Sequence, residues 1–198
     1  YKVCVACLSR YKNNIDSNPE KLIKSVIKSI DFQDAFIVFR IDKSDCILYY
    51  KLLFKKYSKK INMCIITGED FRSRADFPLF WEDTFKKLSK IKFIWYQITS
   101  DDSYFDKKNW IQDLHQISKK EELFMVSDVK LNYPCKVWYL DDEGNKIFIN
   151  QPPTVNYPAI KSKVLNFLLK KFPNEPLFGP NMSSDTYWGM IFGDSTNY

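Results

Sequence analysis

The stretch Phe-Ile-Trp-Tyr-Gln-Ile-Thr-Ser-Asp-Asp-Ser, residues 93–103, decides the fold prediction. It begins with an apolar run of strand length, which leads directly into two adjacent aspartates. We therefore predict a strand over residues 93–98, with Asp101 and Asp102 directly after its carboxyl end.

Upstream of this stretch, apolar runs of strand length alternate with segments of helical periodicity. The run at residues 3–7 suits a central parallel strand that is buried on both faces. Asn18-Pro19 and Ser44-Asp45 are typical helix starts. The expected order is strand 3–7, helix 19–30, strand 35–42, helix 45–57, strand 61–66, helix 79–90 and strand 93–98. This alternation predicts the α/β class, with a doubly wound, mostly parallel sheet and right-handed crossovers.

Downstream of residue 103 the pattern changes. Two apolar runs around residues 141–145 predict a hairpin. The elements expected here are a helix at 110–117, a strand at 123–126, hairpin strands at 136–140 and 146–149, a Pro-rich loop at 151–158 and a helix at 159–172. No internal repeat or low-complexity linker divides the chain, so residues 1–198 are predicted to form a single domain with a small antiparallel hairpin extension.

The net charge of +6 comes mainly from lysines on the polar faces of the expected helices, and we interpret them as a solvated surface. Nucleic-acid binders gather arginines or basic-aromatic stripes on one face, so nucleic acid is not expected as a partner. A modestly basic surface would still attract a phosphorylated ligand or an anionic membrane. No apolar run approaches the ~20 residues that span a bilayer, so no transmembrane segment is expected.

The five cysteines lie mostly in apolar stretches. Cys4 and Cys7 have C-x-x-C spacing, but residues three apart on a strand face opposite sides. No second pair completes a zinc site, and the single histidine, His115, is expected at the surface or half-buried on a helix. Buried, reduced thiols in a cytoplasmic protein are the expectation.

Three polar groups follow the predicted strands: Ser9-Arg10-Tyr11, Asp42 and Asp101-Asp102. Ligands of an open parallel sheet bind at the carboxyl ends of its strands. Because no Gly-rich phosphate motif follows any strand, Mg²⁺ or Mn²⁺ on carboxylates is the natural substitute for holding phosphates. The aspartate pair is the candidate metal site, although aspartates in such a position also cap helices.

The order of these elements resembles the GT-A glycosyltransferases, most closely the family-2-type inverting enzymes and their minimal virus-encoded members. Residues 2–11 resemble the N-terminal strand and polar-aromatic turn, and residues 41–44 resemble the acid after the second strand. Residues 100–103 resemble the D-x-D or D-D element, and residues 183–188 resemble the segment that holds the catalytic base. The resemblance covers the whole chain through order and spacing, while each motif alone is unspecific.

This resemblance implies metal-dependent transfer of a sugar, with inversion, from a nucleotide-sugar donor to a hydroxyl acceptor. A UDP-sugar is the favoured donor, a glycan or glycosylated molecule is the acceptor, and Mn²⁺ or Mg²⁺ is the cofactor. Residues 1–103 would be the nucleotide-binding half and residues 104–198 the acceptor-binding half. A virus-encoded member would act in the host cytoplasm.

The family's site residues carry over one by one onto matching positions. They are Ser9 in the nucleotide site, Tyr11 stacked on the nucleotide base, Asp42 at the base or ribose, Asp101 at the ribose or metal, Asp102 on the metal, Arg74 at the diphosphate and Asp185 as the general base. A solvated loop arginine is an equal reading of Arg74, and Asp194 competes for the role of the base.

Some residues depart from the family pattern, and other functions stay open. Ser103 stands where a fuller acidic triad has Asp, and Ser184 stands where an acid often precedes the base. The chain is short for the family, so both a minimal enzyme and a domain of a longer multidomain chain fit its length. The alternatives are a catalytically inert GT-A-like domain that binds a nucleotide or glycan, and a nucleotidyltransferase.

Overall fold

The computed structural model describes residues 1–12, 16–29, 34–70, 77–118, 125–129, 136–140, 146–150, 155–163 and 165–166. Its elements, in chain order, are β1 (Val3–Ser9), α1 (Pro19–Ser29), β2 (Ala35–Asp42), α2 (Ile47–Tyr57), β3 (Asn62–Gly68), α3 (Phe77–Leu88), β4 (Trp95–Ser100), α4 (Trp110–Ser118), β5 (Met125–Val129), β6 (Lys136–Leu140), β7 (Lys146–Asn150) and β8 (Val155–Lys161).

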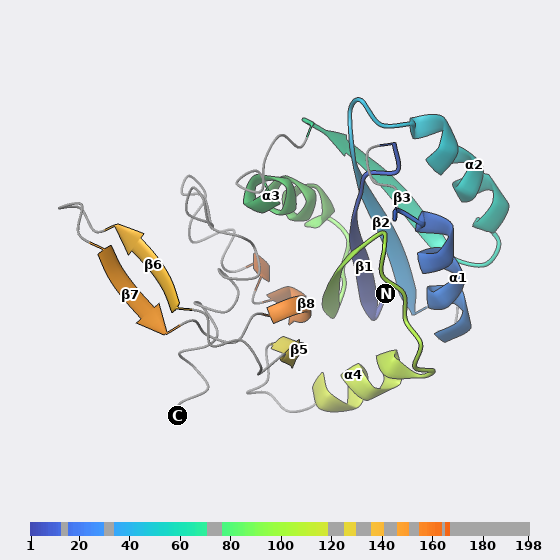
Figure 1. Cartoon of the computed structure of the whole chain (residues 1–198). Coiled ribbons are helices and arrows are strands. Elements are labelled where there is room, and N and C mark those ends of the chain that lie inside the picture. The colour runs from blue at the N-terminus through green and yellow to red at the C-terminus, as the bar shows by residue number, and fades with distance from the viewer. Residues whose placement is uncertain are drawn as a thin grey trace.

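One sheet organises the molecule, with the strand order β3-β2-β1-β4-β8-β5. The pairs β1–β2, β1–β4 and β2–β3 are parallel, whereas β8 is antiparallel to both β4 and β5. Strands β6 and β7 form a separate antiparallel pair (Figure 1). The prediction of an α/β domain with a doubly wound, mostly parallel sheet and an antiparallel hairpin is confirmed.

Helices cover both faces of this sheet. Helices α1 and α2 lie on one side of the parallel strands and α3 lies on the other (Figure 1). Helix α4 belongs to the α1 side, since Ile111 packs in the same core as Leu22 and the Trp110 indole N–H donates to Ser29 Oγ at 2.9 Å. Every residue of β1 is buried, because both of its faces are covered. Within the described part of the chain, no helix is both long and apolar enough to cross a bilayer.

The two predicted helix starts have different outcomes. Asn18 caps α1 as expected, because its Oδ1 accepts the N–H of Lys21 at 3.0 Å. The predicted cap at Ser44-Asp45 is wrong: Cys46 is the N-cap of α2 and makes no side-chain capping bond. The Asp45 carboxylate accepts hydrogen bonds from the Cys46 N–H, from the Lys12 N–H and from the Tyr50 hydroxyl, so it joins α2 to the loop after β1.

The predicted loop at 151–158 and helix from residue 159 are wrong where the structure describes them. Residues 155–161 form β8, and its Ala159 and Ile160 pair with Gln97 and Tyr96 of β4. The backbone N–H and C=O groups at the edge of β4 are paired by β8. This pairing determines the conformation of residues 155–161 more strongly than local helix propensity does. The β5–β8 register shifts between Val126 and Asp128, next to Pro158, which has no N–H to donate. Of the described residues after β8, residues 162–163 and 165–166 are helical.

Candidate functional site

The parallel register brings the carboxyl ends of four strands to one edge of the sheet. Leu8 of β1 lies beside Arg40 of β2 and Ser100 of β4, and Asp42 lies beside Gly68 of β3. The polar residues that follow these strands therefore meet at this edge. They include five residues predicted from the sequence: Ser9, Tyr11, Asp42, Asp101 and Asp102.

Asp101 is buried, and its hydrogen bonds connect three segments of the chain. Its Oδ2 accepts hydrogen bonds from Ser9 Oγ at 2.6 Å, from the Arg10 N–H at 2.9 Å and from the Ser17 hydroxyl. Its backbone carbonyl accepts the N–H of Asn18, directly before α1, at 2.8 Å. With an exposed fraction of 3%, this carboxylate joins the end of β4 to the loop after β1 and to the start of α1.

Asp102 is exposed, unlike its neighbour. Its Oδ1 accepts hydrogen bonds from the hydroxyls of Ser100 and Ser103, which orient the carboxylate from one side. Among the described residues, no group of three His, Cys, Asp or Glu side chains could hold a metal ion by itself. The exposed oxygens of Asp102 are the hard ligands that Mg²⁺ and Mn²⁺ prefer, and this cation type usually completes its shell with phosphates and water. The residues present therefore fit a metal that is shared with a phosphorylated ligand.

The loop after β1 is held by hydrogen bonds to its backbone. The Tyr11 N–H donates to the Tyr50 hydroxyl at 3.2 Å, and the Lys12 N–H donates to Asp45 Oδ1 at 3.0 Å. The Tyr50 hydroxyl also contacts Ser9 Oγ at 2.7 Å and Asp45 Oδ2 at 3.1 Å. Burial raises the pKa of Tyr50 far above its usual value, so this hydroxyl stays protonated.

Sequence reasoning missed Asp45 and Tyr50. Asp45 has the spacing of a helix cap, and Tyr50 falls on the buried stripe of α2. The polar role of both residues depends on a loop that lies far from them in the sequence.

Tyr11 presents a supported aromatic ring at the same edge. Its ring stacks on Tyr49 with centroids 3.7 Å apart and planes 8° from parallel, yet 39% of Tyr11 remains exposed. Burial raises the pKa of Tyr49 to about 12. An aromatic ring with one face braced and substantial exposure suits stacking against a flat ligand.

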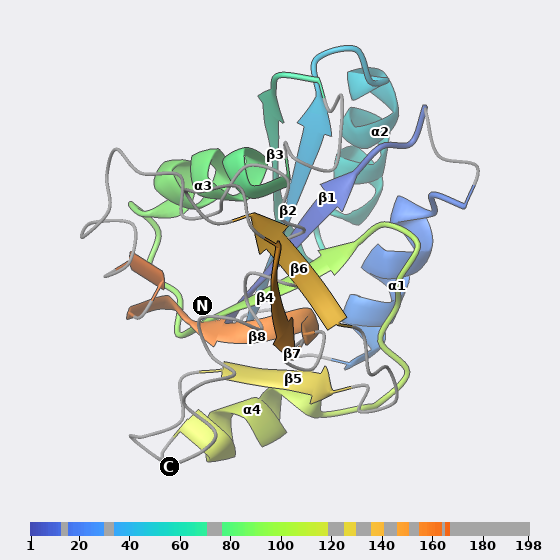
Figure 2. The same cartoon turned by 60° about the vertical axis from the view of Figure 1, so that its left-hand side comes forward.

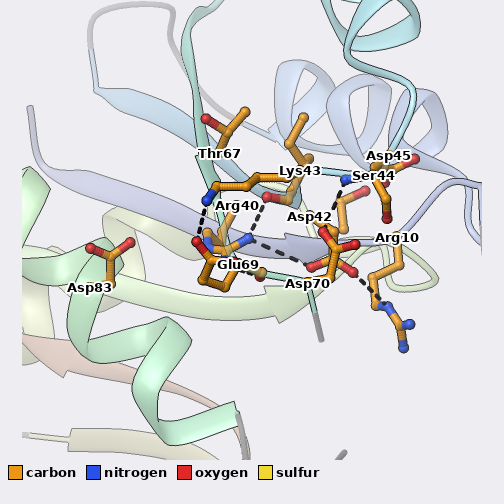
Figure 3. A network of polar contacts seen from close by, with 12 residues as sticks. Arg10, Arg40, Asp42, Lys43, Ser44, Asp45, Thr67, Glu69, Asp70 and Asp83 are labelled. Atoms are coloured by element: carbon orange, nitrogen blue, oxygen red, sulfur yellow. Dashed lines mark hydrogen bonds and ion pairs between the residues drawn. The ribbon is translucent and has the colours of Figure 1, made fainter. Parts of the chain in front are cut away.

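Asp42 lies between two arginines (Figure 3). Its Oδ2 accepts a hydrogen bond from Arg10 Nε at 3.3 Å, and its Oδ1 is 3.7 Å from Arg40 Nη1. Only 2% of Asp42 and 1% of Arg40 are exposed. Removing a carboxylate from water is costly without a partner charge, and these two guanidinium groups supply it. Arg10 also donates its backbone N–H to Asp101, so one residue connects both carboxylates.

Arg40 is enclosed by the carboxyl ends of β2 and β3. Its guanidinium donates to the carbonyl of Glu69 at 2.8 Å and to the carbonyl of Ile41. A Cβ placed on Gly68 would overlap the Arg40 guanidinium, so any larger residue there would force this group to shift. Burial lowers the pKa of Arg40, while the charge of Asp42 opposes this shift. Arg40 was missed from the sequence because it lies inside an apolar strand.

Polar contacts extend from Asp42 along the rim to β3. The Lys43 N–H donates to the Gly68 carbonyl at 2.9 Å, and the Lys43 ammonium pairs with Glu69. The Ser44 N–H donates to Asp70 Oδ1 at 3.0 Å, and hydrogen bonds from Ser44 lower the pKa of Asp70. Figure 3 shows these side chains side by side around Asp42.

Three predicted features lie outside the described residues. They are Arg74, Asp185 and its competitor Asp194, so their predicted roles stay predictions. His115 falls in α4 as expected, but its side chain is likewise outside the description.

No family model and no curated protein sequence matches the chain. Solved structures do resemble it. The crystal structure of S. aureus TarS 1-349 matches with a TM-score of 0.61 and 13% identity, covering 98% of this chain and 55% of that one. The same protein in complex with UDP-GlcNAc matches with a TM-score of 0.57 and 13% identity, covering 94% and 51%.

A second protein has a comparable fold. The 4-diphosphocytidyl-2C-methyl-D-erythritol synthase of Anaerococcus prevotii matches with a TM-score of 0.58 and 16% identity, covering 98% of this chain and 84% of that one. The chain thus spans about half the length of the TarS 1-349 chain and most of the synthase. Identities this low show the fold alone, which is a GT-A-like α/β domain.

Proposed function

We propose that the protein transfers a sugar, with inversion, from a nucleotide-diphosphate donor to a hydroxyl acceptor. The observation that carries this proposal is the meeting of Tyr11, Asp42 and Asp102 at the carboxyl edge of a GT-A-like sheet. TarS, which has the same fold, was solved with UDP and with UDP-GlcNAc, and this supports a UDP-sugar as the favoured donor.

In this proposal the nucleoside binds between Tyr11 and Asp42. The braced ring of Tyr11 stacks on the base, and the Asp42 carboxylate accepts a hydrogen bond from the base or the ribose. Ser9 and Asp101 act mainly by holding the loop that carries Tyr11, since both are buried and bonded to each other. Arg74 meets the diphosphate.

The metal, Mn²⁺ or Mg²⁺, is proposed to bind at Asp102 together with the diphosphate. When bound, it neutralises the charge that develops on the departing nucleotide. Asp102 supplies a carboxylate oxygen whose direction is set by the Ser100 and Ser103 hydroxyls. Asp101, directly before Asp102, contributes to the same site by holding the turn in which both residues lie.

Asp185 is proposed as the general base. A base within hydrogen-bond reach removes the proton of the acceptor hydroxyl as this oxygen attacks the anomeric carbon, and it typically contributes about 10²–10⁴ in rate. The acceptor is proposed to be a glycan or glycosylated molecule of the cytoplasm, the host cytoplasm if the protein is viral. The chain acts by itself or as one domain of a longer protein.

The decisive experiment is calorimetric titration of UDP-sugars with and without Mn²⁺. Wild type and Asp106→Ala, which removes an exposed aspartate four residues away, are expected to bind the donor in a metal-dependent manner. Asp102→Ala should lose this metal dependence while keeping its thermal unfolding unchanged. Equal metal-dependent binding by Asp102→Ala and wild type would overturn the assignment.

Nucleotidyl transfer is the second candidate, because the synthase from Anaerococcus prevotii shares the fold over 84% of its own length. The two reactions release different products. Sugar transfer from a UDP-sugar releases UDP, whereas nucleotidyl transfer from CTP or UTP releases pyrophosphate. Donor binding without release of either product would instead indicate an inert binding domain.

A further inference from the structure

The net positive charge of the chain arises from one pair of helices and the turn that follows them. Residues 19–29 and 47–60 contain eight of the 30 basic residues and one of the 24 acidic residues, Glu20. The rest of the chain holds 22 basic and 23 acidic residues, so α1, α2 and the turn after α2 account for the whole positive excess. The eight are Lys21, Lys24, Lys28, Lys51, Lys55, Lys56, Lys59 and Lys60.

The two helices that carry most of these lysines are neighbours in the fold. Helices α1 and α2 lie side by side on the same side of the sheet (Figures 1 and 2). Glu20 joins them, since its Oε1 lies 3.0 Å from Lys24 Nζ of α1 and 2.9 Å from Lys56 Nζ of α2. Both ammonium groups remain well exposed around this single carboxylate.

Helix α2 also exposes aliphatic side chains. Ile47, Leu48 and Leu52 of α2 are 41%, 63% and 60% exposed. Leu48 and Leu52 are four residues apart, so they lie on one face of the helix. Exposed apolar side chains rimmed by charged residues are a feature of protein and membrane interaction sites. We call these three residues and the eight lysines the α1–α2 surface.

We propose that the α1–α2 surface docks on an anionic lipid bilayer. Lysines near such a membrane are attracted by its negative surface potential, and aliphatic side chains enter the boundary between headgroups and acyl chains. A nucleic acid fits less well, because residues 19–29 and 47–60 contain no arginine and the exposed apolar groups cannot stack on bases as aromatic rings do.

The α1–α2 surface and the candidate site are built from different residues. The surface lies on the α1–α2 side of the sheet, while the site lies at the carboxyl edge of the strands. None of its eleven residues is assigned to the donor, the metal or the base. The inference therefore stands or falls independently of the proposed transferase activity.

The test is co-sedimentation with vesicles of phosphatidylcholine, with and without phosphatidylserine. We expect the full chain to bind only the phosphatidylserine vesicles and to be released by added salt, because salt screens surface charges. The double variant Leu48→Ser/Leu52→Ser should bind about tenfold more weakly, with an unchanged circular dichroism spectrum.

A charge-matched pair of variants locates the contact. Lys55→Glu/Lys59→Glu should abolish binding. Lys90→Glu/Lys92→Glu, which makes the same change in net charge at exposed positions outside the surface, should retain most of it. Equal losses in both variants would overturn the proposal, as would absence of binding at low salt. If Leu48→Ser/Leu52→Ser weakened RNA binding as much as vesicle binding, the surface would be assigned to RNA instead. If the protein were a dimer in sedimentation velocity and this variant dissociated it, the surface would be assigned to a second copy of the chain.

Discussion

Asp101 and Asp102 are chemically identical neighbours whose surroundings give them different tasks. Asp101 is buried and receives hydrogen bonds on its carboxylate from Ser9, Arg10 and Ser17. Asp102 is exposed, and its contacts come from hydroxyls of the same turn. One residue thus stabilises the site and the other is available to a ligand.

We expect Asp101→Ala to lower the free energy of unfolding by about 2–4 kcal/mol, because it leaves buried donors without an acceptor. Asp102→Ala should change it by less than about 0.5 kcal/mol, as exposed substitutions usually do. Urea denaturation of both variants checks the difference. Similar losses in the two variants would contradict these separate roles.

Gly68 and Arg40 form a second residue-scale pair. Gly68→Ala should cost about 1–3 kcal/mol, because the new methyl group overlaps the enclosed guanidinium. In the background of Arg40→Ala the same substitution should cost far less, since the overlapping group is gone. A double-mutant cycle measures this coupling. Additive effects would show that Gly68 and Arg40 do not constrain each other.

At the scale of elements, Tyr50 connects α2 to the loop after β1. Tyr50→Phe removes only a hydroxyl, which contacts Ser9, the Tyr11 N–H and Asp45. We expect a loss of about 1–2 kcal/mol of stability and weaker UDP-sugar binding in calorimetry, because the loop that carries Tyr11 loosens.

Tyr57→Phe is the matched control for Tyr50→Phe. It removes a hydroxyl of the same helix that contacts Glu20 of α1 at 2.6 Å, away from the candidate site. This variant should lose stability while keeping donor affinity. Unchanged donor affinity in Tyr50→Phe would separate the loop from ligand binding.

The contact between α1 and α2 gives a pH dependence. Hydrogen bonds from Tyr57, Lys56 and Lys24 lower the pKa of Glu20 from 4.5 to about 2. A carboxylate with a lowered pKa stabilises the fold fully above its unfolded pKa and loses this contribution as the pH falls. The stabilisation should therefore disappear between about pH 4.5 and pH 2.

Chemical denaturation of wild type and Glu20→Gln at several pH values tests this window. We expect a difference of about 1 kcal/mol near pH 6, the size of a partly exposed ion-pair network, and almost none near pH 2. Asp83→Asn, which removes the ion-pair partner of Lys87, should show a smaller difference. A Glu20→Gln effect that does not vary with pH would argue for lost packing.

The elements differ in how far the sequence predicts them. The strands and helices of the first hundred residues have clear apolar periods, and the positions of Ser9, Tyr11, Asp42, Asp101 and Asp102 follow from the strand ends. Strand β8 was mistaken for loop and helix because its conformation depends on a distant partner, the edge of β4. The partners of the site, Arg40, Asp45 and Tyr50, were missed for the same reason: their contacts cross between elements.

At the scale of the whole molecule, the reactivity of the cysteine thiols indicates which parts of the fold unfold locally and which only globally. Cys4 and Cys7 are fully buried in the central strand, and burial raises the pKa of both thiols. Cys46 is exposed, contrary to the expectation that the cysteines are buried. We expect Cys46 to react quickly with a thiol reagent and the β1 thiols to react only on global unfolding.

This prediction is best measured in a Cys64→Ser/Cys135→Ser background, which leaves these three thiols. Adding Cys46→Ser should remove the fast phase. The remaining reaction should be at least about 10³-fold slower, since the reactive state is reached only by overcoming the stability of the domain. Fast labelling of Cys4 or Cys7 would show that the centre of the sheet opens locally.

The place of β1 at the centre of the sheet also matters while the chain is being synthesised. The end of β2 is residue 42 and the end of β4 is residue 100, so about 60 residues must be added before the second edge of β1 has its partner. At about 5–20 residues per second, the ribosome needs roughly 3–12 s for this. During that interval β1, β2 and β3 can assemble, but the most apolar strand of the protein keeps one hydrogen-bonding edge open to other nascent chains.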